Sequence, residues 1–598
     1  MAGETVSQFL LQRLYDWGVR RIYGYPGDGI NGIMGAIPGF LDKIDYVQVR
    51  HEEEAAFMAT AHAKYSGGEL GVCLATSGPG AIHLLNGLYD AKKDHMPVLA
   101  IVGQQARTAI GADYQQEIDL ISLYKDVASD YVQQASTPAQ VRHLVDEAVR
   151  IALGKRSVTC LIFPHDLQDA PMEQPPRAHG AVLSGIGFNY PRVIPAEADL
   201  RRAAEVLNSG KKVAILVGAG IRDAVDEIIA VADLLGAGIA KALLAKTMVP
   251  DDLPFVTGSI GLLGTEATDR MIMACDTFLM VGSSFPYTEF LPREGQARGV
   301  QIDIDSQRLS LRYPMEVNLQ GDARSTLRAL LPMLERKTDR AWRQRIEGWV
   351  EDWWSTVESR ALNEADPINP QRVFWELSKR LPENCLIAAD SGSTTNWYAR
   401  DLMIRRGMVG SLSGGMATMC PAIPYITAAK FVHPDRPGCA IVGDGAMQML
   451  GNNGLITIAK YWKRWANPQL VVVVANNRDL NQVTWEQRVL EGDPKVEVSQ
   501  DVPDFQYDKY AELLGLVGLR MDQVEDVERV LDEAWRWDRP VVINAYVDPD
   551  VPPLPPHITL QQAKNFMGML AKGEPDAGGV IRQSLKGIAA SYFRRDLD

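Results

Sequence analysis

The stretch AIVGDGAMQML, residues 440–450, combines residue types that could bind a ligand. Its apolar run 439–442 predicts a strand that ends at Gly443-Asp444-Gly445, and a helix is expected over 446–459. Glycines at the end of a strand let the backbone approach a ligand closely, and the acid between them would point toward that ligand. For this turn alone, an aspartate that simply caps a helix is the structural alternative.

A second polar group follows the next apolar run, QLVVVVA at 469–475, which ends at Asn476-Asn477-Arg478-Asp479. If the two strands are parallel neighbours, their polar ends meet at the carboxyl edge of the sheet, where α/β sheets bind ligands. Carboxylate and amide oxygens suit Mg²⁺, which also binds phosphate oxygens, and the helix N-terminus attracts the same phosphates. These residues therefore predict a Mg²⁺–diphosphate site.

The size and composition of the chain limit what surrounds this site. A chain of 598 residues is too long for one hydrophobic core, so three to four domains are expected. The net charge of −14 argues against a nucleic-acid-binding protein, which would need a basic face. Six cysteines without CxxC spacing argue against a zinc site or a disulfide framework and fit a reducing compartment. No apolar run reaches transmembrane length and no secretory signal is recognised, so we expect a cytoplasmic protein.

Strand and helix patterns alternate along nearly the whole chain, which predicts an α/β fold with parallel sheets covered by helices on both faces. A Pro-rich stretch at 169–180 and a Trp-rich charged segment after 336 separate three such doubly wound units. The expected organisation is a first domain at 1–175, a middle domain at 190–335, a linker helix at 336–365, a third domain at 366–548 and a C-terminal tail at 549–598.

The GDG turn followed by NN after a helix and a strand resembles the signature of thiamine-diphosphate enzymes of the pyruvate oxidase, acetolactate synthase and pyruvate decarboxylase group. The resemblance covers almost the whole chain in the family's order of pyrimidine-binding, middle and diphosphate-binding domains, and it is greatest to the pyruvate oxidases. The stretches that carry it are YGYPGDGIN (23–31), RHEEEAAFMA (50–59), residues 71–104, SSFPYTEF (283–290), QIDID (301–305) and PPHITLQQAK (555–564).

The resemblance implies a set of metal and cofactor ligands. Asp444 and Asn477 would bind Mg²⁺ through their side chains, and Asp479 through its backbone carbonyl. The residues expected to contact the cofactor in these domains are Pro26, Gly27, Gly392, Ser393, Ala417, Thr418, Met419, Gly443, Asp444, Gly445, Ala446, Asn477 and Asp479. The segment between the two metal ligands contains KYWKRWANPQ and is longer than usual in the family.

Catalytic roles also follow from the resemblance. Glu52 would be the acid that contacts the cofactor's pyrimidine ring, supplied by the first domain of the partner subunit. Met419 would support the bent cofactor, although a methionine there could equally fill a core. His83 and Gln116 fall near the expected substrate position, and Glu486 is expected to assist proton transfer. The structural alternatives are a helix-terminal acid for Glu52 and an ordinary hydrogen-bonded histidine for His83.

FAD binding is expected in the middle domain, in which VAILVGAGI supplies only a weak GxG pattern. The residues that would contact the flavin nucleotide are Gly218, Gly220, Ser284, Phe285, Pro286 and either Asp303 or Asp305. A domain that kept this fold and lost the nucleotide is the alternative. Two residues depart from the pyruvate oxidase pattern: Gln115 and Gln482 stand where aromatic residues are expected. Trp485 is a candidate to replace the aromatic at 482. A substrate more polar than pyruvate would also explain the two glutamines.

The tail contains a basic amphipathic segment, with Val580, Ser584, Leu585, Ile588 and Tyr592 on one helical face. It could contact a membrane and its quinones from the cytoplasmic side, or it could dock on its own subunit.

The expected function is decarboxylation of a 2-oxoacid such as pyruvate by thiamine diphosphate and Mg²⁺, with electrons passed to FAD and then to quinone or O₂. A non-oxidative carboligase or decarboxylase of the acetolactate synthase type, with structural or absent FAD, is the alternative. A non-catalytic regulator is a third hypothesis, which retention of Glu52 and the metal ligands disfavours. Because the site would lie between subunits, we expect at least a homodimer, with a tetramer usual in the family.

Overall fold

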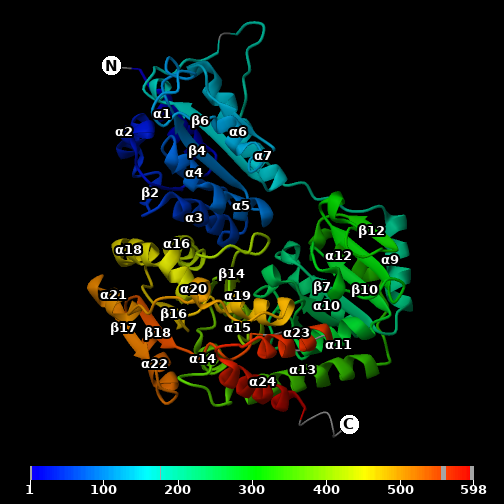
Figure 1. The fold of residues 1–598 in the computed structure, drawn as a ribbon. Helices are drawn as coiled ribbons and strands as arrows, with labels where there is room; N and C mark the ends of the chain where they lie inside the picture. Colours follow the sequence, from blue (N-terminus) through cyan, green and yellow to red (C-terminus); the bar gives the residue numbers. More distant parts are fainter. Residues whose placement is uncertain (1–2, 176, 554–559, 593–598) are drawn as a thin grey trace.

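The computed structural model describes residues 3–175, 177–553 and 560–592 of the chain. It contains three six-stranded sheets in which all paired strands are parallel (Figure 1). Helices flank each sheet, so the predicted fold class of three α/β units with parallel sheets is confirmed.

The first sheet has the strand order β2-β1-β3-β4-β6-β5. Its strands are β1 (Arg21–Gly24), β2 (Asp45–Gln48), β3 (Gly71–Ala75), β4 (Val98–Gln104), β5 (Val132–Gln134) and β6 (Val158–Pro164). Its helices are α1 (Val6–Asp16), α2 (Asn31–Ala36), α3 (Glu52–Tyr65), α4 (Pro79–His83), α5 (Leu85–Lys93), α6 (Leu120–Tyr124), α7 (Val141–Lys155) and α8 (His165–Gln168).

The middle sheet has the order β12-β11-β10-β7-β8-β9. Its strands are β7 (Val213–Val217), β8 (Gly238–Lys241), β9 (Val256–Ser259), β10 (Thr277–Val281), β11 (Arg298–Asp303) and β12 (Val317–Gln320). Its helices are α9 (Glu197–Ser209), α10 (Val225–Leu235), α11 (Glu266–Ala274) and α12 (Ala323–Leu330), and the long helix α13 (Ala341–Ala361) lies within the predicted linker segment.

The third sheet has the order β14-β13-β15-β16-β18-β17. Its strands are β13 (Leu386–Ala389), β14 (Val409–Ser411), β15 (Gly438–Gly443), β16 (Leu470–Asn476), β17 (Val517–Met521) and β18 (Val541–Tyr546). Its helices are α14 (Pro370–Arg380), α15 (Ser393–Arg400), α16 (Ala422–Val432), α17 (Asp444–Ala446), α18 (Asn452–Tyr461), α19 (Asn481–Glu486), α20 (Glu497–Gln500), α21 (Tyr507–Leu513) and α22 (Asp526–Ala534).

One hydrophobic core joins the first and third units. Helices α3 and α16 pack against each other between the two sheets, so both are buried on nearly all sides. This explains the alanine-rich sequence of α3, because small side chains let helices and strands approach it from several directions. The packing places Glu52, at the start of α3, on the side of the first unit that meets the third.

The helix expected over 446–459 differs in detail. The chain becomes helical at Asp444 itself, passes through a π-helical turn at 447–451, and continues as α18. A Cβ atom at Gly451 would lie 2.6 Å from the sulfur of Met447, so the wide turn depends on a glycine there. Irregular turns of this kind are often found inside helices at functional sites.

The tail forms α23 (Leu560–Ala571) and α24 (Ala577–Tyr592). Helix α23 packs on the π-helical turn at 487–491, and α24 packs on α13. Met569 and Val580 are fully buried beside Trp485 and Val489, so the tail docks on its own chain. The side chains of Ile588 and Tyr592 lie outside the described set. No helix among the described residues has the length and apolar character needed to cross a membrane.

Candidate active site

Asp444 and Asn477 lie at the ends of two neighbouring strands, as the sequence predicts for a shared edge. Strands β15 and β16 pair in parallel up to Gly443 and Ala475. The Asp444 carboxylate is 3% exposed, and it accepts hydrogen bonds from the backbone N–H of Gly445 at 2.8 Å and of Arg478 at 2.5 Å. Burial raises the pKa of Asp444 to about 7, and the charge of Asp479 adds to the effect. Within the described ranges no lysine, arginine or histidine forms an ion pair with this carboxylate, and such a buried carboxylate fits the binding of a metal ion.

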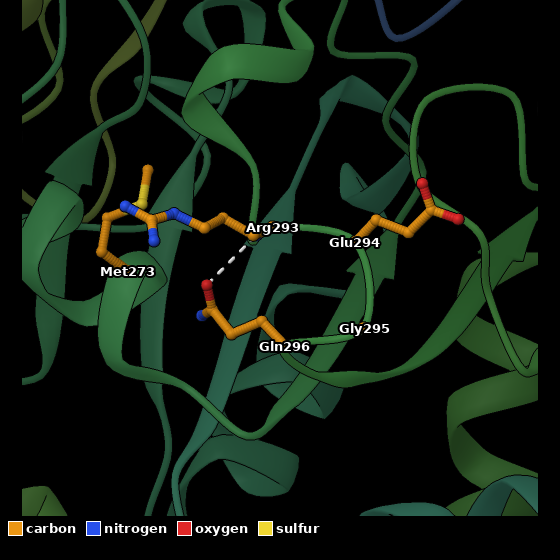
Figure 2. Close-up of a pocket in the computed structure, with 5 residues that line it drawn as sticks. All are labelled: Met273, Arg293, Glu294, Gly295 and Gln296. Atoms are coloured by element: carbon orange, nitrogen blue, oxygen red, sulfur yellow. Dashed lines mark hydrogen bonds between the residues drawn. The ribbon is translucent and has the colours of Figure 1, made fainter.

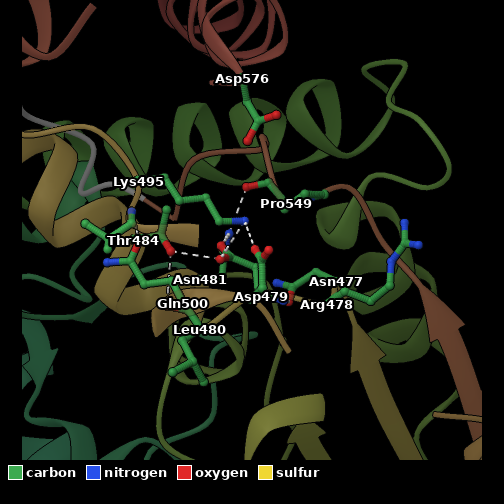
Figure 3. A network of polar contacts seen from close by, with 12 residues as sticks. Asn477, Arg478, Asp479, Leu480, Asn481, Thr484, Lys495, Gln500, Pro549 and Asp576 are labelled. Carbon is green, nitrogen blue, oxygen red and sulfur yellow. Dashed lines mark hydrogen bonds and ion pairs between the residues drawn. The ribbon is translucent and has the colours of Figure 1, made fainter. Parts of the chain in front are cut away.

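Asn477 and Asp479 differ in what their side chains do. The Asn477 side-chain oxygen accepts a hydrogen bond from the Asp479 backbone N–H at 3.1 Å. The Asp479 carboxylate instead contacts Thr484 at 2.9 Å, Asn481 at 3.1 Å and the Lys495 ammonium at 3.2 Å (Figure 3). Its carboxylate is therefore occupied by the protein, which agrees with a backbone rather than a side-chain role for Asp479 toward Mg²⁺. Oxygen donors of this kind fit the hard cation expected there.

Two of the three glycines around the predicted diphosphate position, Gly392 and Gly443, have room beside them, and Gly445 does not. Gly392 has φ +107° and precedes α15, which begins at Ser393, and no atom lies within 4 Å of where its Cβ would stand. Gly443 is equally open. At Gly445 a Cβ would lie 2.8 Å from Leu480 and 3.3 Å from Met419. The structure thus brings Met419 against the turn that carries Asp444, with Ala446 buried behind it.

A buried carboxylate that the sequence analysis missed holds the Met419 loop. Asp390 accepts hydrogen bonds from the backbone N–H groups of Cys420 at 2.8 Å and Ala422 at 3.0 Å, and burial raises its pKa to about 7. Ala417 has φ +51°, a backbone conformation uncommon for a residue with a side chain. Thr418 accepts a hydrogen bond from Asn86 of the first unit at 2.9 Å. The position of an acid directly after the strand 385–389 could have predicted that Asp390 lies at this edge of the sheet.

Glu52 is fixed at the start of α3. Its side chain pairs with His83, with 3.0 Å between the carboxylate oxygen and Nδ1, and the residue is 8% exposed. A Cβ at Gly80 would lie 3.1 Å from the other Glu52 oxygen, so the turn at 76–80 closes tightly over the acid. The two following acids do different work: Glu53 accepts from Asn86 at 2.6 Å, whereas Glu54 is fully buried beside Thr457.

The remaining predicted residues of the first domain gather at the same edge. Pro26 and Gly27 precede a short helical turn, and a Cβ at Gly27 would lie 2.5 Å from Thr76, so this turn packs on the one at 76–80. Gln116 has φ +63°, and its amide oxygen lies 3.4 Å from the Ser77 hydroxyl. Gln115 is exposed. These contacts bring Gly27 and Gln116 to the turn that covers Glu52.

Gln482 and Glu486 form one polar chain with a residue that the sequence analysis missed. The Gln482 oxygen accepts from Asn396 at 2.7 Å, and its amide nitrogen donates to Glu486 at 2.9 Å. Trp485 does not join them. Its ring is 1% exposed in the core formed with the tail, and its N–H donates to the Pro549 carbonyl at 3.1 Å. The suggestion that Trp485 substitutes for an aromatic at 482 was therefore wrong, because the tail buries that side of α19.

In the middle unit, packing alone accounts for two of the predicted nucleotide-binding residues. A Cβ at Gly218 would lie 2.2 Å from the Gly282 carbonyl oxygen, and one at Gly220 would lie 2.7 Å from the Gly282 Cα. Phe285 is buried, whereas Ser284 and Pro286 are exposed. Asp305 caps a helical turn through Gln307 N–H at 2.9 Å and lies 3.4 Å from Arg308. The half-buried Asp303 carboxylate accepts the Asp305 backbone N–H at 3.0 Å, and the Ile304 N–H and the Arg308 charge also act on it.

A surface hollow of about 580 Å³ lies elsewhere in this unit (Figure 2). Met273, Arg293, Glu294, Gly295 and Gln296 line it, and the Gln296 side chain binds the Arg293 N–H at 3.1 Å. Met273 precedes β10 and residues 293–296 precede β11, so the hollow lies at the amino edge of the sheet. The predicted flavin residues follow β7, β10 and β11 at the opposite edge, and the hollow is therefore not the expected nucleotide site.

Comparison with known families matches all three units. The profile described as the thiamine pyrophosphate enzyme N-terminal TPP binding domain matches residues 4–123. The central domain of the same enzymes matches residues 200–330, and their C-terminal TPP binding domain matches residues 390–545.

Full-length relatives agree with these matches. The chain is 34% identical over 572 residues to YdaP of Bacillus subtilis, named as a thiamine pyrophosphate-containing protein, with 96% of each chain covered. It is 30% identical to a pyruvate oxidase of Lactiplantibacillus plantarum, over 92% of this chain and 89% of the relative. It is 28% identical to an acetolactate synthase of Mycobacterium leprae, over 91% of this chain and 87% of the relative.

Proposed function

The chain belongs to the thiamine pyrophosphate enzyme family, and on that premise we propose that it catalyses oxidative decarboxylation of a 2-oxoacid, with pyruvate as the first candidate. The observation that carries the proposal is the presence of both chemical halves of the site. Glu52 is fixed by His83 in the first unit, and Asp444 and Asn477 stand at adjoining strand ends in the third. When bound, thiamine diphosphate supplies the nucleophilic carbon and electron sink that decarboxylation needs.

The residues of the third unit would hold the charged end of the cofactor. The side-chain oxygens of Asp444 and Asn477, with the backbone carbonyl of Asp479, would bind Mg²⁺. Ser393 begins α15 after the open turn at Gly392, so the N–H groups of that helix start are available to phosphate oxygens. The binding of a cation would also remove the cost of burying the Asp444 charge.

The residues of the first unit would handle protons. Glu52 is buried enough to exchange a proton with a bound ring nitrogen rather than with bulk water, and the His83 contact fixes the position of its carboxylate. The His83 side chain is 42% exposed, so it can also reach a substrate. Gln116 and the Glu486 carboxylate are further candidates for substrate contact and proton transfer.

Electron transfer to FAD, and then to quinone or O₂, is the finer part of the proposal. The similarity to a pyruvate oxidase supports it, as does the position of Asp303 at the end of β11, on the same edge of the sheet as the other predicted flavin residues. The second candidate is a carboligase or decarboxylase of the acetolactate synthase type, with structural or absent FAD. The observation that favours it is Gln482, whose amide is held between Asn396 and Glu486 where the pyruvate oxidase pattern expects an aromatic ring.

The proposal also covers how the subunits assemble. We propose at least a homodimer in which Glu52 of one subunit serves the cofactor held by Asp444 of the other, and a tetramer as the family's usual state. The docking of α24 on α13 and the burial of Val580 favour the interpretation that the tail covers its own subunit. Contact of the tail with a membrane or its quinones remains the alternative.

A visible absorption spectrum of the purified protein tests the oxidative proposal. Flavin that bleaches when Mg²⁺, thiamine diphosphate and pyruvate are added without oxygen is the expected result. Flavin that stays oxidised while CO₂ is released would instead identify a carboligase with structural FAD. A colourless protein that is active with thiamine diphosphate would refute the redox proposal.

A further inference from the structure

Two imidazole rings lie close to each other and to the Glu52 carboxylate. His51 precedes Glu52 at the start of α3, and His83 ends α4. The ring centroids of the two histidines are 4.4 Å apart with 30° between the ring planes. One ligand atom of each of the three side chains lies within 4.8 Å of the other two.

These three groups are the ligand types of a transition-metal site. Two histidines and one glutamate bind Zn²⁺ in well-known enzymes, with a water molecule in the fourth position. Imidazole nitrogen selects zinc, cobalt and nickel, whereas Mg²⁺ prefers an all-oxygen set such as the one predicted at Asp444. The partly exposed His83 side chain leaves a path for the ion and for a water ligand.

The geometry needs only a small adjustment. The His83 Nδ1 and the Glu52 oxygen are 3.0 Å apart, close to the separation of two atoms that share one metal with bonds of about 2.0–2.2 Å. His51 caps α3 through Nδ1, which accepts from the Glu53 N–H at 3.2 Å, so Nε2 is not used by the cap. The start of a helix disfavours cations, but the negative charges of Glu52 and Glu53 oppose that effect.

We propose that His51, Glu52 and His83 form a binding site for Zn²⁺ or a similar imidazole-preferring divalent ion, separate from the Mg²⁺ ligands at Asp444. A metal bound to the Glu52 carboxylate would remove the group offered to the cofactor's ring nitrogen. Zinc and thiamine diphosphate would then exclude each other. This second step rests on the proposed function of Glu52, whereas the metal site does not.

Titration of the tag-free, full-length protein, freed of cofactor and metal, tests the site. Isothermal titration with Zn²⁺ and the visible absorption of Co²⁺ would be compared for the wild type, His83→Asn and His51→Asn. Asparagine at 51 keeps a helix-capping acceptor while removing the imidazole. His165→Asn, at an exposed position on α8, is the matched control. All six cysteines are buried, so they offer little competition for the ion.

We expect one zinc ion per chain, bound at least about tenfold more weakly by each of the two site variants and unchanged in the control. Saturation with Mg²⁺ and thiamine diphosphate should lower the apparent zinc affinity of the wild type. Equal zinc affinity in the wild type and both site variants would overturn the site. Histidine-dependent zinc binding that the cofactor does not weaken would overturn the exclusion. Loss of turnover in Glu52→Gln without histidine-dependent zinc binding would leave the proposed function standing and refute this inference alone.

Discussion

Glu574 joins the tail to the segment that follows the predicted metal ligands, so its removal should release the tail. Its side chain is fully buried, pairs with the Arg488 guanidinium and accepts from the Lys495 backbone N–H at 2.9 Å. The Arg488 side chain is 2% exposed; Asp576 lies 3.6 Å from it, and the charge of Asp550 also acts on it. In Glu574→Gln the buried guanidinium therefore loses its nearest carboxylate and keeps weaker ones.

The expected cost follows from the burial of both groups. Removing one partner of a buried ion pair costs about 3–5 kcal/mol, and the lower end applies here because Asp576 remains. A loss of about 3 kcal/mol corresponds to a shift of about two orders of magnitude in the equilibrium between docked and undocked tail. The three sheets have their own cores, so the change should be local rather than global.

Hydrogen exchange of the segment 560–592 measures this equilibrium directly. Faster exchange in Glu574→Gln, with unchanged exchange in β15 and β16, is the expected result. Glu491→Gln is the control, because Glu491 lies on the same turn that α23 covers but is exposed. If Glu574→Gln and the control exchange equally in 560–592, the ion pair does not hold the tail and the reasoning from burial fails.

Four further changes have defined outcomes. Burial raises the pKa of Glu54 from 4.5 to about 7, so the unfolded state ionises first and stability is lost as the pH rises between these values. Glu54→Gln should therefore raise the free energy of unfolding at pH 8 by up to about 3 kcal/mol, seen as a higher melting temperature, and give no gain at pH 4. Gly218→Ala should lower the free energy of unfolding by about 1–3 kcal/mol through overpacking, seen as a lower melting temperature. Gly185→Ala, where the space is open, should leave it unchanged, and equal stability of the two variants would contradict the packing explanation. Asp444→Asn should weaken Mg²⁺-dependent binding of thiamine diphosphate, measured by fluorescence titration. Asp435→Asn, at an exposed acid before β15 on the opposite edge of the sheet, should leave it unchanged. Because Val580 is buried, full-length protein and a chain ending at 576 should float equally poorly with anionic liposomes, and flotation of the full chain alone would favour membrane contact.

Local patterns were sufficient to predict that Asp444 and Asn477 lie at one edge of the third sheet. The runs 439–442 and 470–475 are fully apolar because β15 and β16 are buried on both faces, and the polar residues that follow them lie at the end of the sheet. Parallel pairing of these two strands then places Asp444 and Asn477 at one edge. The same reasoning applies to Glu52, which begins a helix directly after a strand.

Contacts between distant segments could not be predicted in this way. Lys495 reaches Asp479, and Asn396 reaches Gln482, only because separate loops fold onto one edge. The direction in which the Trp485 side chain points could not be predicted from its spacing. It lies three residues after Gln482, whereas Glu486 lies four residues after it and makes the side-chain contact. Nothing in the sequence around 485 indicates that Met569 and Val580 pack on the Trp485 ring or that the Pro549 carbonyl accepts its N–H.

We propose that Glu52 acts together with Asp444 and Asn477 in a decarboxylase that depends on thiamine diphosphate. Release of ¹³CO₂ from pyruvate labelled at the carboxyl carbon, with saturating Mg²⁺ and thiamine diphosphate, measures this activity. We expect release by the wild type and by Glu53→Gln, and a loss of about a hundredfold or more in Glu52→Gln, whose fold circular dichroism should find intact. Release by Glu52→Gln at the wild-type rate would refute the role of Glu52.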